Sequence, residues 1–320
     1  MKKKLISACV LLSALYMASC DSKTTSSDTK GDSIITSVKP IDKGNGIFAF
    51  EFNGLYFETD ASHAGRISAF GLNGKNFLTG KDVNPVNWGT SLWPSPQSAW
   101  GWPPSKQLDG LPYIGGIKDS LFIELTSQKD SLLGYVFKKE YKANPADSSV
   151  TITYTAINDS EKKQSLSLWE ITRVAPGGLT IYPSGKTKKK GLLEPLTKDS
   201  LGITWFKYVT EKIPSGDVVP KLLSDGSEGW MAQVNNGIIL IKKFSDVPVE
   251  KTAPEEGEIE LYANPDKSYI EIEQQGEYTA LEPGKSLSWE IKWYLKTLPS
   301  GIDGTNANQA LVDYIRKTVK

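Results

Sequence analysis

The sequence predicts an all-β domain, an antiparallel sandwich or barrel, with one short helix near its C-terminus. Apolar and polar residues alternate with a period of two along most of the chain, as in strands that bury one face. Asn-Gly pairs at 53–54 and 73–74 each separate two such runs, which indicates tight β-hairpins. Helical periodicity is convincing only close to the C-terminus, and many short strands joined by turns favour a sandwich or barrel.

The first strands form the hairpins 46–60 and 65–78. Further runs with strand alternation are Leu121–Ser127, Leu133–Tyr141, Ser149–Asn158, Gln164–Val174, Ile203–Val209, Gly229–Gln233, Ile238–Phe244, Glu258–Tyr262, Tyr269–Gln274 and Ser286–Leu295. We expect loops over 80–116 and 175–200, and a core position for Trp289 and Trp293 because they alternate with apolar neighbours.

The C-terminal segment 305–319 is the one stretch with helical spacing. Its apolar stripe consists of Ala307, Leu311, Tyr314 and Ile315. Thr305 or Asn306 is the expected N-cap, since both residue types accept a hydrogen bond from the first turn.

The N-terminus has the features of an export signal. Lys2–Lys4 precede an apolar run, Leu5–Met17, that is too short to span a bilayer in the mature protein. Small residues then lead to Cys20, and the whole segment resembles a bacterial lipoprotein signal, in which the cysteine is lipidated and becomes the new N-terminus. The alternative is an ordinary secretory signal with an incidental cysteine.

Charge and cysteine content exclude several classes of function. The chain has 37 basic and 37 acidic residues, and loss of the three signal lysines leaves 34 against 37, a net charge of −3. A nucleic-acid partner is not expected for so balanced a chain. Of its two cysteines, Cys9 lies inside the apolar run and Cys20 at its end, so the mature protein would have no free pair. It would therefore lack a disulfide framework, a thiolate nucleophile and a zinc-type cysteine cluster.

Residues 88–104, WGTSLWPSPQSAWGWPP, combine four tryptophans with four prolines. Proline fixes φ and removes a backbone donor, so we expect a rigid surface loop rather than a central strand. Some of these tryptophans must be buried, because large exposed apolar patches are rare on monomers. The others need a partner, which is another protein or a flat apolar surface such as a sugar ring. Trp93, Trp100 and Trp102 are the candidates for a sugar, and we expect one or two tryptophans of this segment to be available to a ligand.

Two strands carry the candidate charged groups. Alternation in 268–278 places Glu271 and Glu273 on one face, where closely spaced carboxylates become an acid/base pair if that face lines a cleft, and ordinary surface charges if it does not. In 166–174, Trp169 and Arg173 share one face and Glu170 lies on the other. Arg173 beside Trp169 would form a platform for a sugar, with a Trp in the sandwich core as the alternative.

Four segments resemble a known superfamily, the galactose-mutarotase-like proteins. HAGRISAFGLNGKNFL (63–78) resembles their early hairpin, and IEIEQQGEYTALEPGKSLSWEIKWYL (270–295) resembles their C-terminal signature. LWPSPQSAWGWPP (92–104) and LWEITRVAPGG (168–178) resemble an uncharacterised bacterial domain family of the same superfamily. The resemblance spans residues 45–296 and implies a β-supersandwich whose concave sheet binds sugars.

The resemblance also implies site residues. Aldose epimerases of this fold use a C-terminal glutamate to deprotonate the anomeric hydroxyl, and Glu273 matches that position best, with Glu271 next. Arg66 matches the arginine of the family's Gly-Arg-Ile segment. The family's acid histidine has no counterpart, because the chain's one histidine, His63, is not at that position. The resemblance therefore implies recognition of a sugar more strongly than it implies the epimerase reaction.

These observations predict four segments: a lipoprotein signal (1–19), a lipid-anchored tether (20–35), the supersandwich (36–298) and a C-terminal linker and helix (299–320). The leading hypothesis is a saccharide-binding lipoprotein of the bacterial envelope, held at a membrane, the outer one by preference, and facing periplasm or exterior. The alternatives are a sugar-active enzyme (epimerase, hydrolase or lyase) that uses Glu170, Glu271 or Glu273, and a structural envelope component. No cofactor is expected; the acidic segment 254–260 leaves calcium as an alternative.

Overall fold

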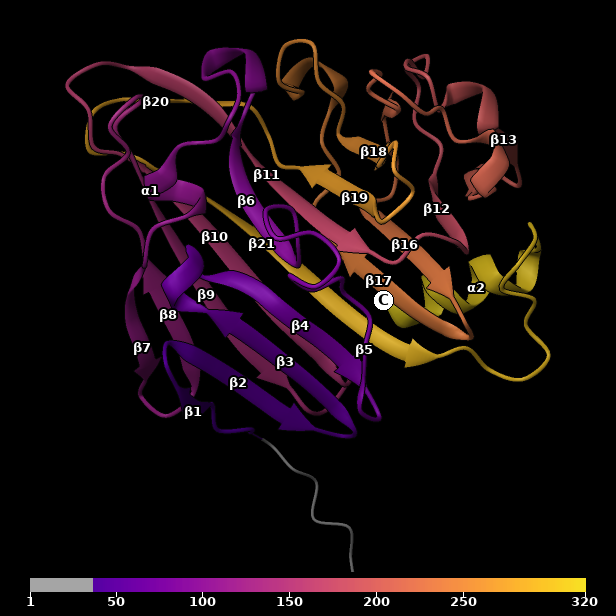
Figure 1. Cartoon of the computed structure of the whole chain (residues 1–320), viewed down its shortest axis with the longest axis horizontal. Coiled ribbons are helices and arrows are strands. Elements are labelled where there is room, and N and C mark those ends of the chain that lie inside the picture. Colours follow the sequence, from indigo (N-terminus) through magenta and orange to yellow (C-terminus); the bar gives the residue numbers. More distant parts are fainter. Residues whose placement is uncertain (1–36) are drawn as a thin grey trace, which may run out of the picture. The chain divides into compact units, whose positions relative to one another are not determined.

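Two antiparallel β-sheets make up most of the computed structural model, which describes residues 37–320 (Figure 1). The predicted signal 1–19, Cys20 and the tether 20–35 lie outside the described residues. Within the described part of the chain, no helix is long and apolar enough to cross a membrane. The all-β class is confirmed, and it takes the form of two sheets packed face to face.

The first sheet has the order β1-β2-β3-β4-β6-β11-β19-β18-β15, with β5 added beside β4 and β20 beside β11. Its strands are β1 (Ile41–Gly44), β2 (Ile47–Phe52), β3 (Leu55–Asp60), β4 (Arg66–Leu72), β5 (Lys75–Asn76), β6 (Thr90–Ser95), β11 (Gln164–Val174), β15 (Lys221–Ser224), β18 (Ile259–Ala263), β19 (Ile270–Gln275) and β20 (Thr279–Leu281). Both predicted Asn-Gly hairpin turns are present, since Asn53-Gly54 joins β2 to β3 and Asn73-Gly74 joins β4 to β5, all four residues with positive φ.

The second sheet has the order β13-β14-β12-β16-β17-β21-β10-β9-β8-β7. Its strands are β7 (Ile114–Lys118), β8 (Phe122–Thr126), β9 (Tyr135–Asn144), β10 (Ser149–Asn158), β12 (Leu179–Pro183), β13 (Thr197–Ser200), β14 (Ile203–Lys207), β16 (Trp230–Asn235), β17 (Ile238–Lys243) and β21 (Ser286–Thr297). The C-terminal strand β21 lies in the middle of this sheet, between β17 and β10 (Figure 1).

The main apolar core lies between the two sheets. Phe57 and Phe70 of the first sheet are completely buried and belong to the same cluster as Tyr141 and Trp293 of the second. The ring of Phe70 lies 5.6 Å from that of Trp293, an aromatic contact across the two layers. Trp289 and Trp293 are both buried, as their alternation predicts.

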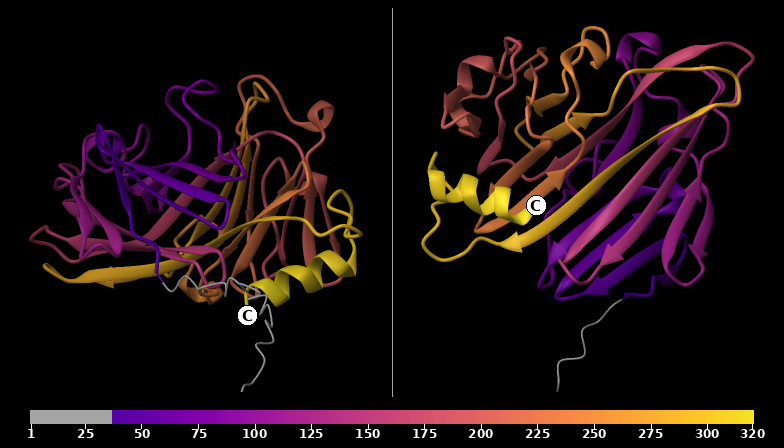
Figure 2. Two further views of the ribbon diagram at one scale, coloured as in Figure 1. Left: turned by 90° about the horizontal axis from the view of Figure 1, so that it is seen from below. Right: turned by 180° about the vertical axis from the view of Figure 1, so that it is seen from behind.

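A helix, α2 (Gln309–Thr318), covers the outer face of the second sheet (Figure 2). Its buried residues Leu311, Val312 and Ile315 pack in one cluster with apolar side chains of β12, β14, β16 and β17. The predicted helix is confirmed, but neither expected N-cap is right. Asn308 caps it by accepting from the Leu311 N–H at 2.9 Å, because Thr305 and Asn306 instead bond to Asp303 in the preceding turn.

The tryptophan- and proline-rich segment differs from the expected loop. Thr90–Ser95 forms β6, a fully buried strand that pairs with β11 along its whole length. Beyond the pair Ile67–Thr90 it has no partner in β4, so Pro94 lies where one edge of the strand is free of ladder bonds and its missing N–H costs little. Strands β12 and β13 likewise lie in the second region expected to be a loop, 175–200, and β7 begins at the end of the first, 80–116.

Short helical turns occupy several connections. They are α1 (Lys106–Asp109) and the 3₁₀ turns η1 (Ala61–His63), η2 (Gln97–Ala99), η3 (Glu194–Leu196), η4 (Thr210–Lys212) and η5 (Val249–Lys251). Two of them, η1 and η2, flank the part of the first sheet that carries the candidate site.

Candidate functional site

A cavity of about 350 Å³ opens on the first sheet, and we call it the aromatic cavity. It is lined by Asn87, Trp93, Gln97, Trp102, Trp169, Val219, Lys221, Tyr262, Tyr269, Glu271 and Glu273. These residues come from β6, β11, β15, β18, β19 and the connections between them. Five neighbouring strands of one sheet therefore build the floor, and loops build the rim.

Strand pairing explains why the charged groups meet. β11 and β19 run antiparallel with Ile171 opposite Glu273 and Arg173 opposite Glu271. Side chains alternate across each strand, so Trp169 and Arg173 come to the same face as the two glutamates. The shared face of Glu271 and Glu273 that the alternation predicts is thus confirmed, and it lines a cavity.

The tryptophans of this region form one cluster around Trp93. The ring of Trp93 meets Trp100, Trp102 and Trp169 edge to face, at centroid distances of 5.8, 5.8 and 5.4 Å. Trp93 is 5% exposed, whereas Trp102 is 58% exposed at the rim. Trp100 does not line the cavity; it packs against Trp93 and donates from Nε1 to the Pro94 carbonyl at 2.7 Å.

Glu271 is held by a buried arginine. Nε of Arg173 donates to Oε1 of Glu271 at 2.8 Å, and Nη1 donates to the Ser91 hydroxyl at 2.8 Å. The guanidinium also lies 5.4 Å from the ring centre of Trp93. Arg173 is completely buried and does not line the cavity, so the structure places it beneath the floor, where it orients Glu271.

Glu273 shares one ammonium group with a second buried glutamate. Nε1 of Trp169 donates to Glu273 at 2.9 Å, and Nζ of Lys221 lies 3.8 Å from Glu273 and 2.5 Å from Glu260. Burial raises the pKa of Glu273 to about 7; Lys221 opposes this shift and the Glu271 charge adds to it. Burial likewise raises the pKa of Glu260 to about 8, again against Lys221. Because Lys221 supplies only one positive charge to Glu260 and Glu273, one of these two carboxyls is expected to be protonated near neutral pH.

The other wall carries polar aromatic groups. Tyr262 and Tyr269 lie with their ring centres 6.2 Å apart, and Asn87 donates to the Tyr269 hydroxyl at 3.2 Å. Nε1 of Trp93 is buried, and no side chain or backbone group of the described residues accepts its proton. The cavity thus presents indole faces together with donors and acceptors of hydrogen bonds.

Two predicted site residues lie elsewhere. Glu170 is buried on the opposite face of β11, between the sheets, where it pairs with Lys242 at 3.0 Å and accepts from the Tyr154 hydroxyl at 2.7 Å. Arg66 is also buried; it pairs with Asp109 at 3.1 Å and borders a separate cavity. The structure therefore brings Trp93, Trp102, Glu271 and Glu273 together, and leaves Trp100, Arg173, Glu170 and Arg66 outside the lining.

Several lining residues are absent from the sequence-based prediction. Tyr262 pairs with Glu271 in the β18–β19 hairpin, and the alternation of 258–262 would have placed it on the face of Glu260. Lys221, Asn87 and Gln97 come from segments with no clear periodicity, and nothing in their local sequence marks them.

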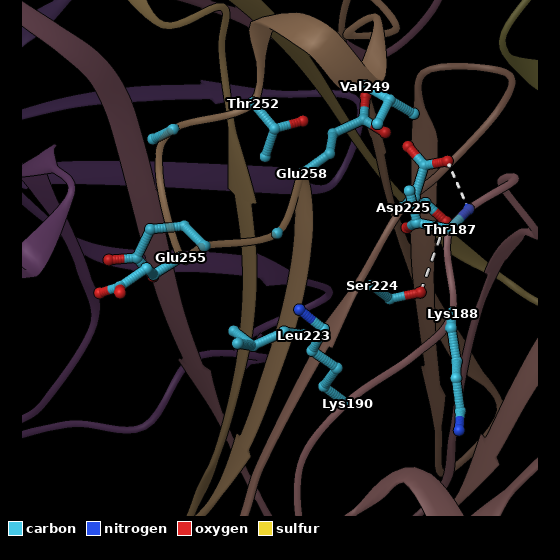
Figure 3. Close-up of a pocket in the computed structure, with 13 residues that line it drawn as sticks. Thr187, Lys188, Lys190, Leu223, Ser224, Asp225, Val249, Thr252, Glu255 and Glu258 are labelled. Atoms are coloured by element: carbon cyan, nitrogen blue, oxygen red, sulfur yellow. Dashed lines mark hydrogen bonds between the residues drawn. The ribbon is translucent and has the colours of Figure 1, made fainter.

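Figure 3 shows a different pocket, whose lining includes Lys188, Lys190 and Glu258. Its volume is about 240 Å³. Its carboxylates hold loops in place: Glu258 accepts from the N–H groups of Gly226 and Val247, and Asp225 accepts from that of Lys186 at 2.6 Å. No aromatic side chain lines it. The described residues contain no group of three or more side chains suited to a metal, so the calcium alternative gains no site from residues 254–260.

Comparison with known proteins gives the family and the fold. A family described as a domain of unknown function, DUF4380, matches residues 96–296. No curated protein matches the chain. A solved galactose mutarotase-like protein from Clostridium acetobutylicum is 12% identical, with a TM-score of 0.54 over 82% of this chain and 98% of that one.

Two further solved structures are similar. A galactose mutarotase-like protein from Lactobacillus casei is 13% identical, with a TM-score of 0.55 over 78% of this chain and 100% of that one. A galactose mutarotase related enzyme from Lactobacillus acidophilus is 10% identical, with a TM-score of 0.54 over 82% and 100%. The fold is therefore that of the galactose-mutarotase-like superfamily, as the sequence resemblance predicts.

Proposed function

The chain belongs to the DUF4380 family and has a galactose-mutarotase-like fold, and from this we propose that it is a carbohydrate-binding protein of the bacterial envelope. The fold supports a sugar-related role in general terms. The aromatic cavity supports binding as the specific role.

The lining of the aromatic cavity, where tryptophan and tyrosine rings lie beside carboxylate, ammonium and amide groups, is the observation that carries the proposal. A pyranose ring has an apolar C–H face and a rim of hydroxyl groups, so it suits a tryptophan wall beside polar side chains. The volume of about 350 Å³ lies within the range of small-molecule sites, about 300–1,000 Å³.

A glycan-array screen of the mature protein tests this proposal, with calorimetry on the best ligand. We expect binding that Tyr262→Phe and Trp102→Ala weaken and that Lys188→Ala, in the pocket of Figure 3, leaves unchanged. Absence of binding to any glycan would contradict a carbohydrate-binding function.

The envelope location rests on the N-terminal sequence. We propose that Cys20 is lipidated after signal cleavage and that residues 20–35 tether the domain to a membrane, the outer one by preference. Cys20→Ala should abolish incorporation of labelled palmitate and release the domain or leave an uncleaved precursor. Unchanged labelling of that variant would refute the anchor.

A sugar-active enzyme is the second candidate, because two carboxyls with different environments face one cavity. The pKa of Glu273, raised to about 7 by burial, suits a group that gives or takes a proton, and Glu271 lies beside it in an ion pair with Arg173. His63 lies outside this cavity. A binding protein leaves freshly dissolved α-glucose and α-galactose to equilibrate at the uncatalysed rate in polarimetry. An acceleration that Glu273→Gln abolishes would establish the enzyme instead.

A further inference from the structure

A second cavity, of about 320 Å³, lies beside the aromatic cavity, and we call it the side cavity. Its lining includes His63, Arg66, Trp88, Pro104, Lys106 and Asp109. These residues belong to η1, the start of β4, the segment before β6 and the region of α1.

The two cavities are contiguous. Asn87 and Trp102 line both of them. Trp102 is the most exposed tryptophan of the cluster, at 58%, and its ring contacts Trp93 of the aromatic cavity. Trp102 therefore presents surface to both cavities.

The side cavity offers the same kind of surface as the aromatic cavity. Trp88 lies beneath Arg66, whose guanidinium is 4.8 Å from the ring centre, and its indole meets the His63 ring edge to face. The partly exposed His63 is fixed by Asp60, with 2.7 Å between Nδ1 and Oδ2. Asp109 accepts from Arg66 at 3.1 Å, and Nε of Arg66 is buried with no acceptor among the described residues. Trp88 is 5% exposed and has Lys81 as well as Arg66 against its ring, so Trp102 supplies the exposed aromatic face of this cavity beside these polar groups.

We propose that the two cavities are neighbouring subsites of one oligosaccharide site, with Trp102 at the junction of two sugar units. The inference rests on the proposed carbohydrate-binding function and names its ligand class, a chain of at least two linked sugars rather than a free monosaccharide. Each cavity alone is at the small end of ligand sites, so a monosaccharide uses only part of the available surface.

The test is a length series of the best-binding glycan (mono-, di- and trisaccharide) measured by calorimetry on the mature protein in detergent. We expect affinity to rise at least about tenfold from monosaccharide to the longer ligands, equivalent to about 1.4 kcal/mol. His63→Ala and Lys106→Ala should reduce oligosaccharide affinity about three- to tenfold, the effect of one lost hydrogen bond, and leave monosaccharide affinity unchanged. Both side chains are at least partly exposed, so the folded state should tolerate these truncations, as thermal melting verifies.

Two results would overturn the inference while the proposed function stands: a monosaccharide that binds as tightly as its oligomers, or oligosaccharide affinities that neither variant changes. Failure of every saccharide to bind would instead refute the proposed function and the inference together. Lys188→Ala is the matched control for Lys106→Ala and should affect no ligand.

Discussion

Trp102 and Trp93 differ in what their removal should do. Trp102 is mostly exposed, so Trp102→Ala should weaken saccharide binding by about 1–3 kcal/mol, the scale of aromatic stacking measured with nucleic-acid bases, and leave the melting temperature unchanged. Trp93 is buried against three other tryptophans, so Trp93→Ala should also cost about 3–5 kcal/mol of folding free energy. Calorimetry and urea unfolding of both variants measure the two effects separately. An equal loss of folding free energy in Trp102→Ala and Trp93→Ala would contradict the exposed rim position of Trp102.

Buried glutamates set a pH dependence of stability. Burial raises the pKa values of Glu258 and Glu273 to about 7 and of Glu260 to about 8, from an ordinary value of 4.5. The folded state thus binds more protons than the unfolded state between about pH 4.5 and 7, and the free energy of unfolding should fall as pH rises through that window. Urea unfolding at pH 5 and pH 7 measures the fall.

Glu273→Gln should reduce this slope, because glutamine does not titrate. The expected contribution of Glu273 is on the order of 2 kcal/mol, since a tenfold change in an acid dissociation constant corresponds to about 1.4 kcal/mol. A variant with the full wild-type slope would show that Glu273 titrates normally.

At the scale of elements, β11 and β19 carry the site on one face and are fixed on the other. Lys242 of β17 reaches across from the second sheet to Glu170 at 3.0 Å, to the Thr172 hydroxyl at 2.6 Å and to Gln274 at 3.1 Å. These contacts hold the two strands that position Trp169, Glu271 and Glu273. Loss of the Lys242 contacts should therefore shift the site residues on the opposite face of these two strands.

Lys242→Met should therefore cost about 3–5 kcal/mol of folding free energy, because it leaves the Glu170 carboxylate buried without its cation. The double variant with Glu170→Gln should recover part of that loss, since it removes the orphaned charge as well. Denaturant unfolding of both single variants and the double variant gives the coupling free energy. If the losses of folding free energy in Lys242→Met and Glu170→Gln simply add in the double variant, the ion pair between Lys242 and Glu170 is contradicted.

Clean alternation allowed accurate prediction of some elements. The predicted runs Ser149–Asn158 and Gln164–Val174 coincide with β10 and β11. β12 (Leu179–Pro183) is a five-residue strand that ends in a proline, and β6 contains Pro94, which argues against a strand inside a sheet, so neither was predicted. Periodicity in the sequence, rather than burial in the structure, decides which strands are predicted, since β11 and β19 are also buried on both faces.

The same physics limits prediction of the site. Period-two spacing placed Glu271 and Glu273 on a common face without any knowledge of the neighbouring strands. Lys221 reaches Glu273 only because β15 pairs with β18 and β18 with β19, a register that no local pattern encodes. The position of Glu170 between the sheets likewise depends on Lys242, which is distant in sequence.

For the whole molecule, the central place of β21 determines when the chain can fold. In the second sheet, strands β7–β10 come from residues 114–158 and strands β12–β14, β16 and β17 from 179–243, and only β21 joins these two blocks. During synthesis that sheet stays in two separate parts until residues 286–297 have left the ribosome. For the export proposed above, such late completion would keep this sheet unfinished until nearly the whole chain has been made. A chain ended at Lys285 should consequently be degraded by trypsin within the time that leaves the intact domain whole, and a protease-resistant product of that length would contradict this order of events.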